Sequence, residues 1–241
     1  MKLTFLTSCS AVCLAVTAHS AIVINEIFAD DAFGDDAEFV ELFGLPGESL
    51  SGLSFIVVDG DTGGSTDSSS YRRVNEQYDF TTEVMPSDGF FVIGFGLAPG
   101  VADLVETSSF LQNGSQTYAL VPTADISYDL VDTDELTQAS VDAITASLID
   151  AVGNIDAADD DIYFGATDIS DGSGFAIDTA SRIPNGVDTD SAGDWLTQST
   201  FEPPLELGDS IATPGATNVP EPSVMILSAL GILGFLGCRR R

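Results

Sequence analysis

From residue 22 onward, apolar residues come in short runs that are separated by turn-forming residues. The first three runs are 22–28, 38–43 and 53–58, and each is rich in Val, Ile or Phe. Clusters of Gly and Asp follow them, and these residue types favour turns. Short β-prone runs bounded by such clusters predict three β-strands at the beginning of the body of the protein.

The second run places one glutamate on each face of its predicted strand. Side chains alternate along a strand, so Glu38 and Glu41 fall on opposite faces, each among apolar neighbours. Neither face is purely apolar. We therefore expect one end of this strand to lie in the core and the other near the rim of the sheet.

Two further runs, 89–94 and 117–121, read as a strand pair. The dipeptide Asn113-Gly114 precedes the second of them, and both of its residues tolerate the positive φ of a tight turn. Between 125 and 149 the pattern changes, because Leu136, Ile144 and Leu148 fall near helical spacing. We expect an inserted helix of about three to four turns, capped at Thr133, and a strand at 148–152.

Both ends of the chain have the composition of targeting segments. Residues 1–21 combine Lys2, an apolar stretch and the small residues of Ala18-His19-Ser20-Ala21, which is the layout of a secretory signal peptide. At the other end, the run 224–237 is apolar and is followed by Cys238 and three arginines. As a helix this run would reach about 21 Å, short of the ~30 Å hydrocarbon core of a bilayer.

The segment 219–241 resembles the PEP-CTERM sorting tail of Gram-negative bacteria. The resemblance rests on Pro220-Glu221-Pro222, on the glycine-rich apolar stretch that follows, and on the terminal cluster Arg239-Arg240-Arg241. It implies that Pro220, Glu221 and Pro222 are recognised by an exosortase-type membrane peptidase. It also implies that the arginines stop transfer through the membrane while the body lies outside.

The body resembles a lamin-tail domain, which has an immunoglobulin-like β-sandwich fold. The resemblance rests on several pieces in order: Ile24-Asn25-Glu26-Ile27, Glu38 to Leu42, Leu50 to Leu53, Ser181 to Gly186, Asp188 to Asp190, Asp194-Trp195 and Thr213 to Asn218. We expect Arg182 to be partly buried against a carboxylate and Trp195 to be a core anchor.

The fold class expected is therefore all-β: an immunoglobulin-like sandwich over residues 22–218 with one short inserted helix. A signal helix at 1–21 would precede it, and a sorting tail with a short transmembrane helix at 219–241 would follow it.

The charge of the chain excludes nucleic acid as a partner. The net charge is −31, and all 38 acidic residues follow residue 21. Between residues 22 and 218 the basic residues are Arg72, Arg73 and Arg182. Binding to a phosphate backbone needs clustered Lys and Arg, which this body lacks.

The residue types that perform most enzyme chemistry are missing from the predicted mature body. His19 is the single histidine, Lys2 the single lysine, and Cys9, Cys13 and Cys238 the three cysteines, all outside 22–218. This excludes catalytic triads, Schiff-base lysines and zinc held by His or Cys. Paired carboxylates remain, but 38 acids form chance pairs easily. We expect no catalytic residue, no cofactor and no assigned metal site.

Calcium is the one ion for which the sequence carries a hypothesis, because hard cations bind oxygen ligands from loops. Three acidic clusters lie on predicted loops: Asp30, Asp31, Asp35, Asp36 and Glu38; Asp156, Asp159, Asp160 and Asp161; and Asp188, Asp190 and Asp194. None matches the EF-hand pattern, and solvated acidic loops are the commoner explanation.

Together these observations predict an exported, non-enzymatic protein of the cell surface or extracellular matrix. Its partners would be an exosortase-type sorting enzyme, the membrane before processing, and extracellular polysaccharide. Two alternatives stay open: a carboxylate-based carbohydrate-active enzyme or lectin-like module, and a calcium-stabilised matrix component.

Overall fold

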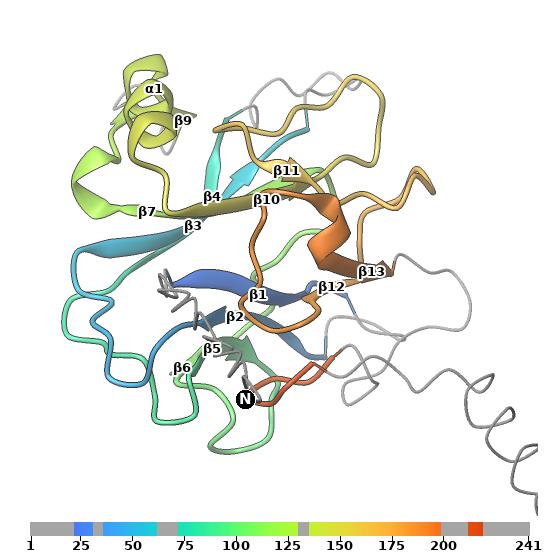
Figure 1. Ribbon diagram of the computed structural model, residues 1–241. Helices are drawn as coiled ribbons and strands as arrows, with labels where there is room; N and C mark the ends of the chain where they lie inside the picture. The colour runs from blue at the N-terminus through green and yellow to red at the C-terminus, as the bar shows by residue number, and fades with distance from the viewer. Residues whose placement is uncertain (1–21, 31–35, 62–71, 130–134, 199–211, 219–241) are drawn as a thin grey trace, which may run out of the picture.

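The computed structural model describes residues 22–30, 36–61, 72–129, 135–198 and 212–218. Within these ranges the chain is mostly β, with two large sheets, a two-stranded ribbon, one α-helix and two short 3-10 turns (Figure 1). The two large sheets face each other as the layers of a β-sandwich, as the sequence predicted.

One layer is a six-stranded sheet. Its order is β13 (Trp195–Gln198), β12 (Thr179–Arg182), β1 (Val23–Phe28), β2 (Glu38–Phe43), β5 (Phe90–Phe95) and β6 (Leu104–Val105). Neighbouring strands are antiparallel except for β5 and β6, which are parallel. The first and last parts of the sandwich therefore meet in this sheet, because β1 pairs with β12.

The other layer is a five-stranded sheet. Its order is β11 (Thr167–Asp168), β10 (Asp150–Asn154), β7 (Gln116–Pro122), β3 (Leu53–Asp59) and β4 (Val74–Asp79). Here β10 and β11 are parallel and the other pairs antiparallel. The ribbon pairs β8 (Tyr128–Asp129) with β9 (Glu135–Leu136) beside this sheet.

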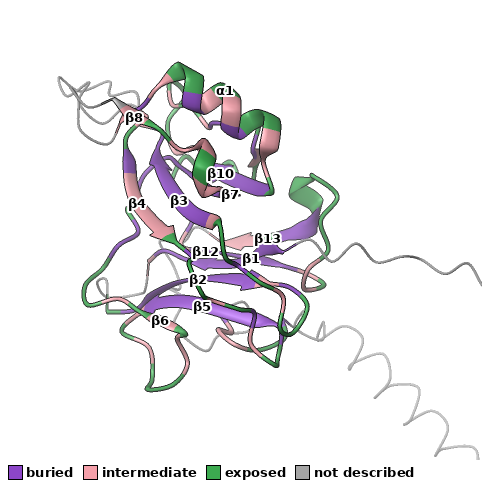
Figure 2. Cartoon of the chain, turned by 90° about the vertical axis from the view of Figure 1, so that its left-hand side faces the viewer, coloured by how far each residue is buried: buried purple, intermediate pink, exposed green. Residues whose placement is uncertain are grey.

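Alternation along the strands builds a separate apolar layer on each side of the sheets. In β3, Phe55 and Val57 point between the sheets, whereas Ile56 and Val58 point to the opposite face. That opposite face is covered by α1 (Gln138–Ser147), whose outer surface is exposed (Figure 2). A third, smaller cluster around Phe28 covers the outer face of the six-stranded sheet. The central strands of both sheets are thus buried on both faces, whereas β4, β6 and β13 at the edges are partly exposed.

The inserted helix exists, but it begins later than the sequence pattern suggested. Its N-cap is Thr137, whose hydroxyl accepts a hydrogen bond from the backbone N–H of Ser140 at 3.1 Å. Thr133 lies outside the described residues, and Leu136 belongs to β9. Thr137 stands where the chain turns away from β9, so its hydroxyl reaches the first free amides of the helix.

The two strands read as a pair from the sequence lie in different sheets, so that pairing is wrong. The strand at 89–94 is β5, which pairs with β2 and β6, and the strand at 117–121 is β7, which pairs with β3 and β10. After β5 the chain forms β6 in the same sheet before it crosses to the other layer. Alternating apolar residues allow either arrangement, and packing of the two layers decides between them.

The expectation that β2 runs from core to rim is also wrong. Glu38 and Glu41 are both fully buried, and in β2 only Phe43 is partly exposed. The glutamates can be buried because loops from elsewhere in the chain cover them and donate hydrogen bonds to them.

The predicted signal peptide, 1–21, and the whole of the predicted sorting tail, 219–241, lie outside the described residues. Among the described residues, no helix combines the length and the apolar character that a membrane crossing requires.

Candidate functional site

Arg182 joins the two sheets from the middle of the molecule. Its guanidinium Nε donates to the carbonyl of Ile24 at 2.7 Å, and Nη2 lies 3.0 Å from both carboxylate oxygens of Asp150. Asp150 also accepts a hydrogen bond from the N–H of Ile24 at 2.7 Å. The β1–β2 register shifts between Ile24 and Glu26, and the pairing of β1 with β12 begins at Glu26. The Arg182–Asp150 pair therefore binds the N–H and the carbonyl of Ile24, a residue that lies outside the paired part of β1 and β12.

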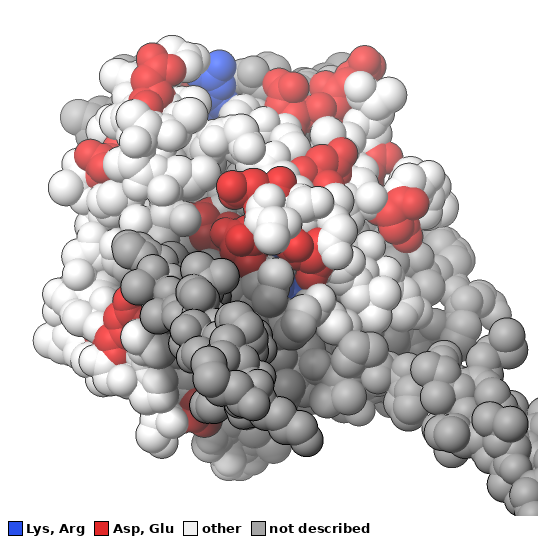
Figure 3. Space-filling model, viewed as in Figure 1, with Lys and Arg blue, Asp and Glu red and all other residues white. Residues whose placement is uncertain are grey.

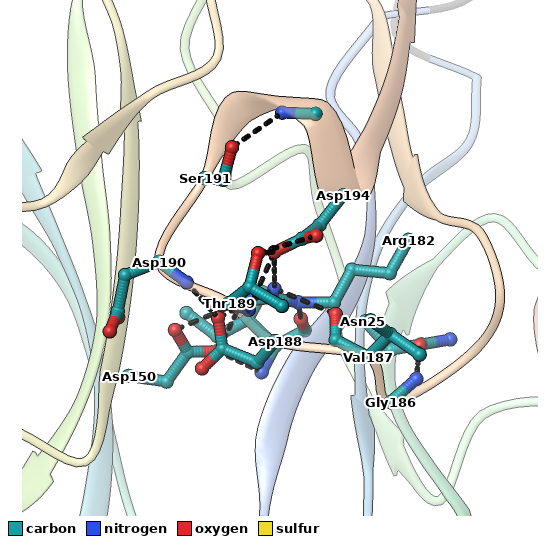
Figure 4. A network of polar contacts seen from close by, with 12 residues as sticks. Asn25, Asp150, Arg182, Gly186, Val187, Asp188, Thr189, Asp190, Ser191 and Asp194 are labelled. Atoms are coloured by element: carbon teal, nitrogen blue, oxygen red, sulfur yellow. Dashed lines mark hydrogen bonds and ion pairs between the residues drawn. The ribbon is translucent and has the colours of Figure 1, made fainter.

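Two further carboxylates face the same guanidinium (Figure 4). Nη1 lies 2.9 Å from Asp188 and 3.8 Å from Asp194, and the Trp195 ring lies 4.5 Å from the guanidinium carbon. Burial raises the pKa of Asp150 to about 6 although the charge of Arg182 lowers it. The pKa of Asp194 is lowered, chiefly by the hydrogen bond from the N–H of Thr189. The expected burial of Arg182 against a carboxylate and of Trp195 in the core is confirmed.

A pair of buried glutamates lies on the outer face of the six-stranded sheet. Glu26 of β1 and Glu41 of β2 are directly opposite each other in the ladder, and neither is exposed to solvent. Among the described residues, no arginine forms an ion pair with either glutamate. Backbone and amide donors bind them instead.

Most of those donors come from the segment Thr213–Asn218, which we call the strap. The N–H of Thr213 donates to Glu26 Oε1 at 2.7 Å, and the N–H of Gly215 donates to Glu41 Oε2 at 2.7 Å. The other oxygen of Glu41 accepts from the side-chain amide of Asn25 at 2.7 Å. In Figure 1 the strap is the red segment on the side of the six-stranded sheet that faces away from the five-stranded sheet.

The local sequence of the strap explains how two successive amides can point at two neighbouring carboxyl groups. The N–H of Ala216 donates to the carbonyl of Thr213, which closes a four-residue turn with Pro214 and Gly215 in its centre. Gly215 has φ +74, a value that favours glycine, and proline before it suits the same turn type. The turn projects both amides toward the sheet.

Hydrogen-bond geometry indicates which glutamate holds a proton. The hydroxyl of Thr213 has one hydrogen, which it donates to Asn218 Oδ1 at 2.7 Å. The same hydroxyl lies 3.3 Å from Glu26 Oε2, where it can donate to the carboxylate or, while its hydrogen is on Asn218, accept a hydrogen bond from the protonated acid. Glu41, in contrast, accepts an N–H at each oxygen. The proton therefore belongs on Glu26.

The pKa values agree with this assignment. Burial, followed by the nearby charge of Glu41, raises the pKa of Glu26 to about 9. Burial raises the pKa of Glu41 to about 8, and the hydrogen bond from Gly215 opposes that rise. Two carboxyl groups that are this close and this buried do not both ionise at neutral pH.

The strap ends at Asn218, which is 3% exposed. Its backbone N–H donates to Asn185 Oδ1 at 2.9 Å, and its side-chain amide donates to the carbonyl of Arg182 at 3.1 Å. Comparison with known protein families matches residues 218–241 to the PEP-CTERM protein-sorting motif. The chain carries a PEP-CTERM sorting motif.

The PEP-CTERM match covers only the C-terminal end of the chain. No curated protein and no solved structure matches the sequence, and no family match shows the lamin-tail domain. Pro220, Glu221, Pro222 and the three terminal arginines all fall inside the matched segment, but outside the described residues. The first matched residue, Asn218, is a buried part of the sandwich.

In the sequence, the glutamates and the strap appear only as separate pieces of the lamin-tail resemblance. Glu26 and Glu41 are 15 positions apart in sequence, and Thr213 is 187 positions beyond Glu26. The available signal was one acidic residue within each of two otherwise apolar strands. A glutamate in such a strand needs buried donors, and the sequence does not show where they come from.

A second group of acids lies at one end of the five-stranded sheet. One carboxylate oxygen from each of Asp61, Asp156 and Asp160 lies within 4.8 Å of the others. The hydroxyl of Ser115 contacts Asp156 at 2.8 Å and Asp160 at 2.7 Å. Partial burial raises the pKa values of Asp61 and Asp156, and neighbouring acids raise them further. The three oxygens are close enough to bind one cation.

Glycine at position 60 permits this arrangement of loops. A Cβ there would lie 2.2 Å from the carbonyl oxygen of Asp161, a separation that real side chains do not show. The N–H of Asp161 donates to the carbonyl of Gly60 at 3.0 Å, which holds the two acidic loops together.

Acidic side chains are spread over the face of the molecule seen in Figure 3, where few basic atoms appear.

The structure places the residues of the three predicted acidic clusters in different surroundings. In the first, Glu38 is buried and accepts the N–H groups of Phe110 and Leu111, while residues 31–35 lie outside the described ranges. The second contributes Asp156 and Asp160 to the group with Asp61, which the sequence did not place there. In the third, Asp188 and Asp194 face Arg182. Among the described residues, calcium stays a hypothesis for the Asp61 group.

Replacing Arg182 with methionine should destabilise the protein strongly. Loss of the guanidinium leaves Asp150 buried without its cation, and breaking a buried ion pair in this way costs about 3–5 kcal/mol. Urea denaturation of the R182M variant measures the change. The exposed Arg73 supplies the control, and R73M should shift the free energy of unfolding by no more than about 0.5 kcal/mol. Equal effects of the two variants would contradict the assigned role of Arg182.

The glutamate pair should make stability fall as the solution becomes alkaline. The folded-state pKa of Glu26, about 9, lies above its ordinary value of 4.5, so the folded protein holds the proton more tightly. This contribution is complete below pH about 4.5 and is lost as the pH rises through about 9. The E26Q variant, in which the amide imitates the protonated acid, should lose less stability than the wild type between pH 7 and about 9.

The E41Q variant is the matched counterpart. A glutamine at this position must direct its NH2 group toward the N–H of Gly215 or the amide of Asn25, both of which are donors. We therefore expect E41Q to be destabilised by about 1–3 kcal/mol at pH 7, whereas E26Q is nearly neutral there. Thermal melting across pH 5 to 9 measures both variants. The reverse order of stability would place the proton on Glu41.

Neutralising one acid of the Asp61 group should stabilise the protein when divalent cations are removed. D61N keeps an oxygen for the N–H of Ser115 and removes one of three repelling charges. Because these groups are largely solvated, the gain should be at most about 1 kcal/mol. Melting temperatures in a chelator measure it, with D142N on α1 as control. A calcium-dependent rise in melting temperature that D61N abolishes would turn the calcium hypothesis into a site.

Proposed function

We propose that this protein is an exported, non-enzymatic structural component of the bacterial cell surface or extracellular matrix. Its PEP-CTERM tail directs it through an exosortase-type sorting enzyme, and the body stays outside the membrane. The observation that carries the proposal is the PEP-CTERM match over residues 218–241. The motif implies export with passage through the membrane, and the structural role is our inference.

The placement of the perturbed carboxyl groups supports a structural role. Glu26 and Glu41 have strongly raised pKa values, as catalytic acids often have, but both are covered by the strap and are 0% exposed. Asp150 is bound by Arg182 and Ile24. These groups hold distant parts of the chain together and do not face solvent.

We also infer that the body is a lamin-tail type, immunoglobulin-like sandwich. The pieces that carry this resemblance come together in space: Asn25 and Glu26 in β1, Glu41 in β2, Arg182 in β12, and the strap. One network of hydrogen bonds would explain why such pieces occur together in a sequence.

The carbohydrate-binding alternative receives less support. It requires an exposed aromatic platform beside acids, and the single tryptophan is a poor candidate. Trp195 is 9% exposed and packs against Arg182 within the core. A structural or adhesive role within extracellular polysaccharide therefore remains our first proposal.

Replacing Pro220-Glu221-Pro222 with three alanines should block sorting. The sorting enzyme would lose the tripeptide it recognises, so the unprocessed chain should accumulate in the membrane fraction. Cell fractionation and immunoblotting of the full chain measure its distribution in a host that has a matching exosortase.

Glu202-Pro203-Pro204 provides a control of identical composition in the same chain. Alanine replacement of these three residues should leave the distribution as in the wild type. If the Pro220–Pro222 variant also reaches the same destination as the wild type, the sorting function is wrong.

A further inference from the structure

The sorting motif follows the folded body without a spacer. Asn218 is buried, and only Val219 stands between it and Pro220. Consecutive Cα atoms are about 3.8 Å apart, so Pro220 lies within about 8 Å of Asn218. Any enzyme that binds Pro220 must therefore approach to within about 8 Å of Asn218 at the surface of the sandwich, unless the strap comes away from the six-stranded sheet.

The strap is attached to three central strands of that sheet. Its first amide binds Glu26 of β1, the amide of Gly215 binds Glu41 of β2, and Asn218 binds the carbonyl of Arg182 in β12. Ala212, just before the strap, is fully buried in the apolar cluster around Phe28. These attachments hold both ends of the strap.

The attachments are also interdependent. The hydroxyl of Thr213 donates to Asn218 Oδ1 at 2.7 Å, which ties the start of the strap to its end. Asn185, which accepts the N–H of Asn218, lies next to Gly186, whose N–H donates to Asn25 Oδ1 at 3.0 Å. Asn25 in turn donates to Glu41. Detaching one end of the strap therefore weakens the donors at the other end.

A common way for a protein to bind a peptide is in an extended conformation, with the peptide backbone hydrogen-bonded to the binding protein. In the strap the corresponding backbone groups are already used. The N–H groups of Thr213, Gly215, Ala216 and Asn218 all have partners within the folded body. The chain immediately before Pro220 cannot bind in an extended cleft while these bonds persist.

We propose that the strap is an autoinhibitory contact, which withholds the chain preceding Pro220 from the sorting peptidase until Thr213–Asn218 detaches from the six-stranded sheet. This inference rests on the proposed sorting function. Detachment precedes recognition, so the observed processing rate is the intrinsic rate multiplied by the small fraction of molecules whose strap is free.

A spacer tests the proposal without changing the folded body. Ten Gly and Ser residues inserted between Asn218 and Val219 supply free chain before the motif and leave every strap contact intact. In a host with a matching exosortase, pulse–chase labelling of the full chain measures the half-time of conversion to the processed form. The spacer variant should be converted at least about fivefold faster than the wild type, because each hydrogen bond that need not break accounts for about that factor.

Two point variants test the same step by weakening the strap. N218A removes the bond to the carbonyl of Arg182, and T213A removes the hydroxyl while keeping the N–H that binds Glu26. Each should accelerate conversion roughly fivefold. T145A is the matched control, since the Thr145 hydroxyl bonds only within α1, to the carbonyl of Val141. Melting temperatures of the purified variants should stay well above the temperature of the assay, which separates detachment of the strap from global unfolding.

The outcomes separate this inference from the sorting function. If alanines at 220–222 abolish conversion while the spacer leaves the half-time unchanged or longer, the strap does not inhibit processing and this inference is wrong. If the alanine variant is still converted and sorted, the sorting function itself fails. Faster conversion of the spacer, N218A and T213A variants, with T145A unchanged, supports the autoinhibitory strap.

Discussion

The structure depends on how an acidic chain with few cations satisfies its buried carboxyl groups. Of the acidic residues that the structure describes, six are at most 9% exposed: Glu26, Glu38, Glu41, Asp59, Asp150 and Asp194. Burying a charge without partners is prohibitively unfavourable. Arg182 forms an ion pair with Asp150 and lies near Asp194. The other buried carboxyl groups accept hydrogen bonds from loop amides, and Glu26 also keeps its proton. Each buried acid therefore requires a particular loop to pack against its sheet.

Because buried carboxyl groups need hydrogen-bond donors, they fix the positions of the loops that supply those donors. Glu38 binds two successive amides, those of Phe110 and Leu111, and thereby fixes the connection that leads into β7. The glutamate pair likewise holds the strap. A purely apolar outer face would bury as much surface but would not specify which backbone segment covers it, because hydrophobic contact is not directional. The carboxylates supply that direction.

The same reasoning links the fold to export. The PEP-CTERM match begins at Asn218, a buried residue whose side chain donates a hydrogen bond to the carbonyl of Arg182 in β12. The proposed autoinhibition would couple stability to processing through the hydrogen bonds of the strap on one face of the six-stranded sheet.

From the sequence alone, the pattern of apolar residues predicted the first three strands and the inserted helix, because alternation and helical spacing are local properties of the chain, whereas the sandwich was what the lamin-tail resemblance implied. The tripeptide 220–222 likewise identified the sorting tail. Only the tertiary structure decided that β5 and β7 lie in different sheets, that Thr137 caps the helix, and that Glu26 and Glu41 share one face beneath Thr213 and Gly215. Those outcomes depend on hydrogen bonds between segments up to 187 positions apart, and no local pattern encodes which distant amide will meet a buried acid.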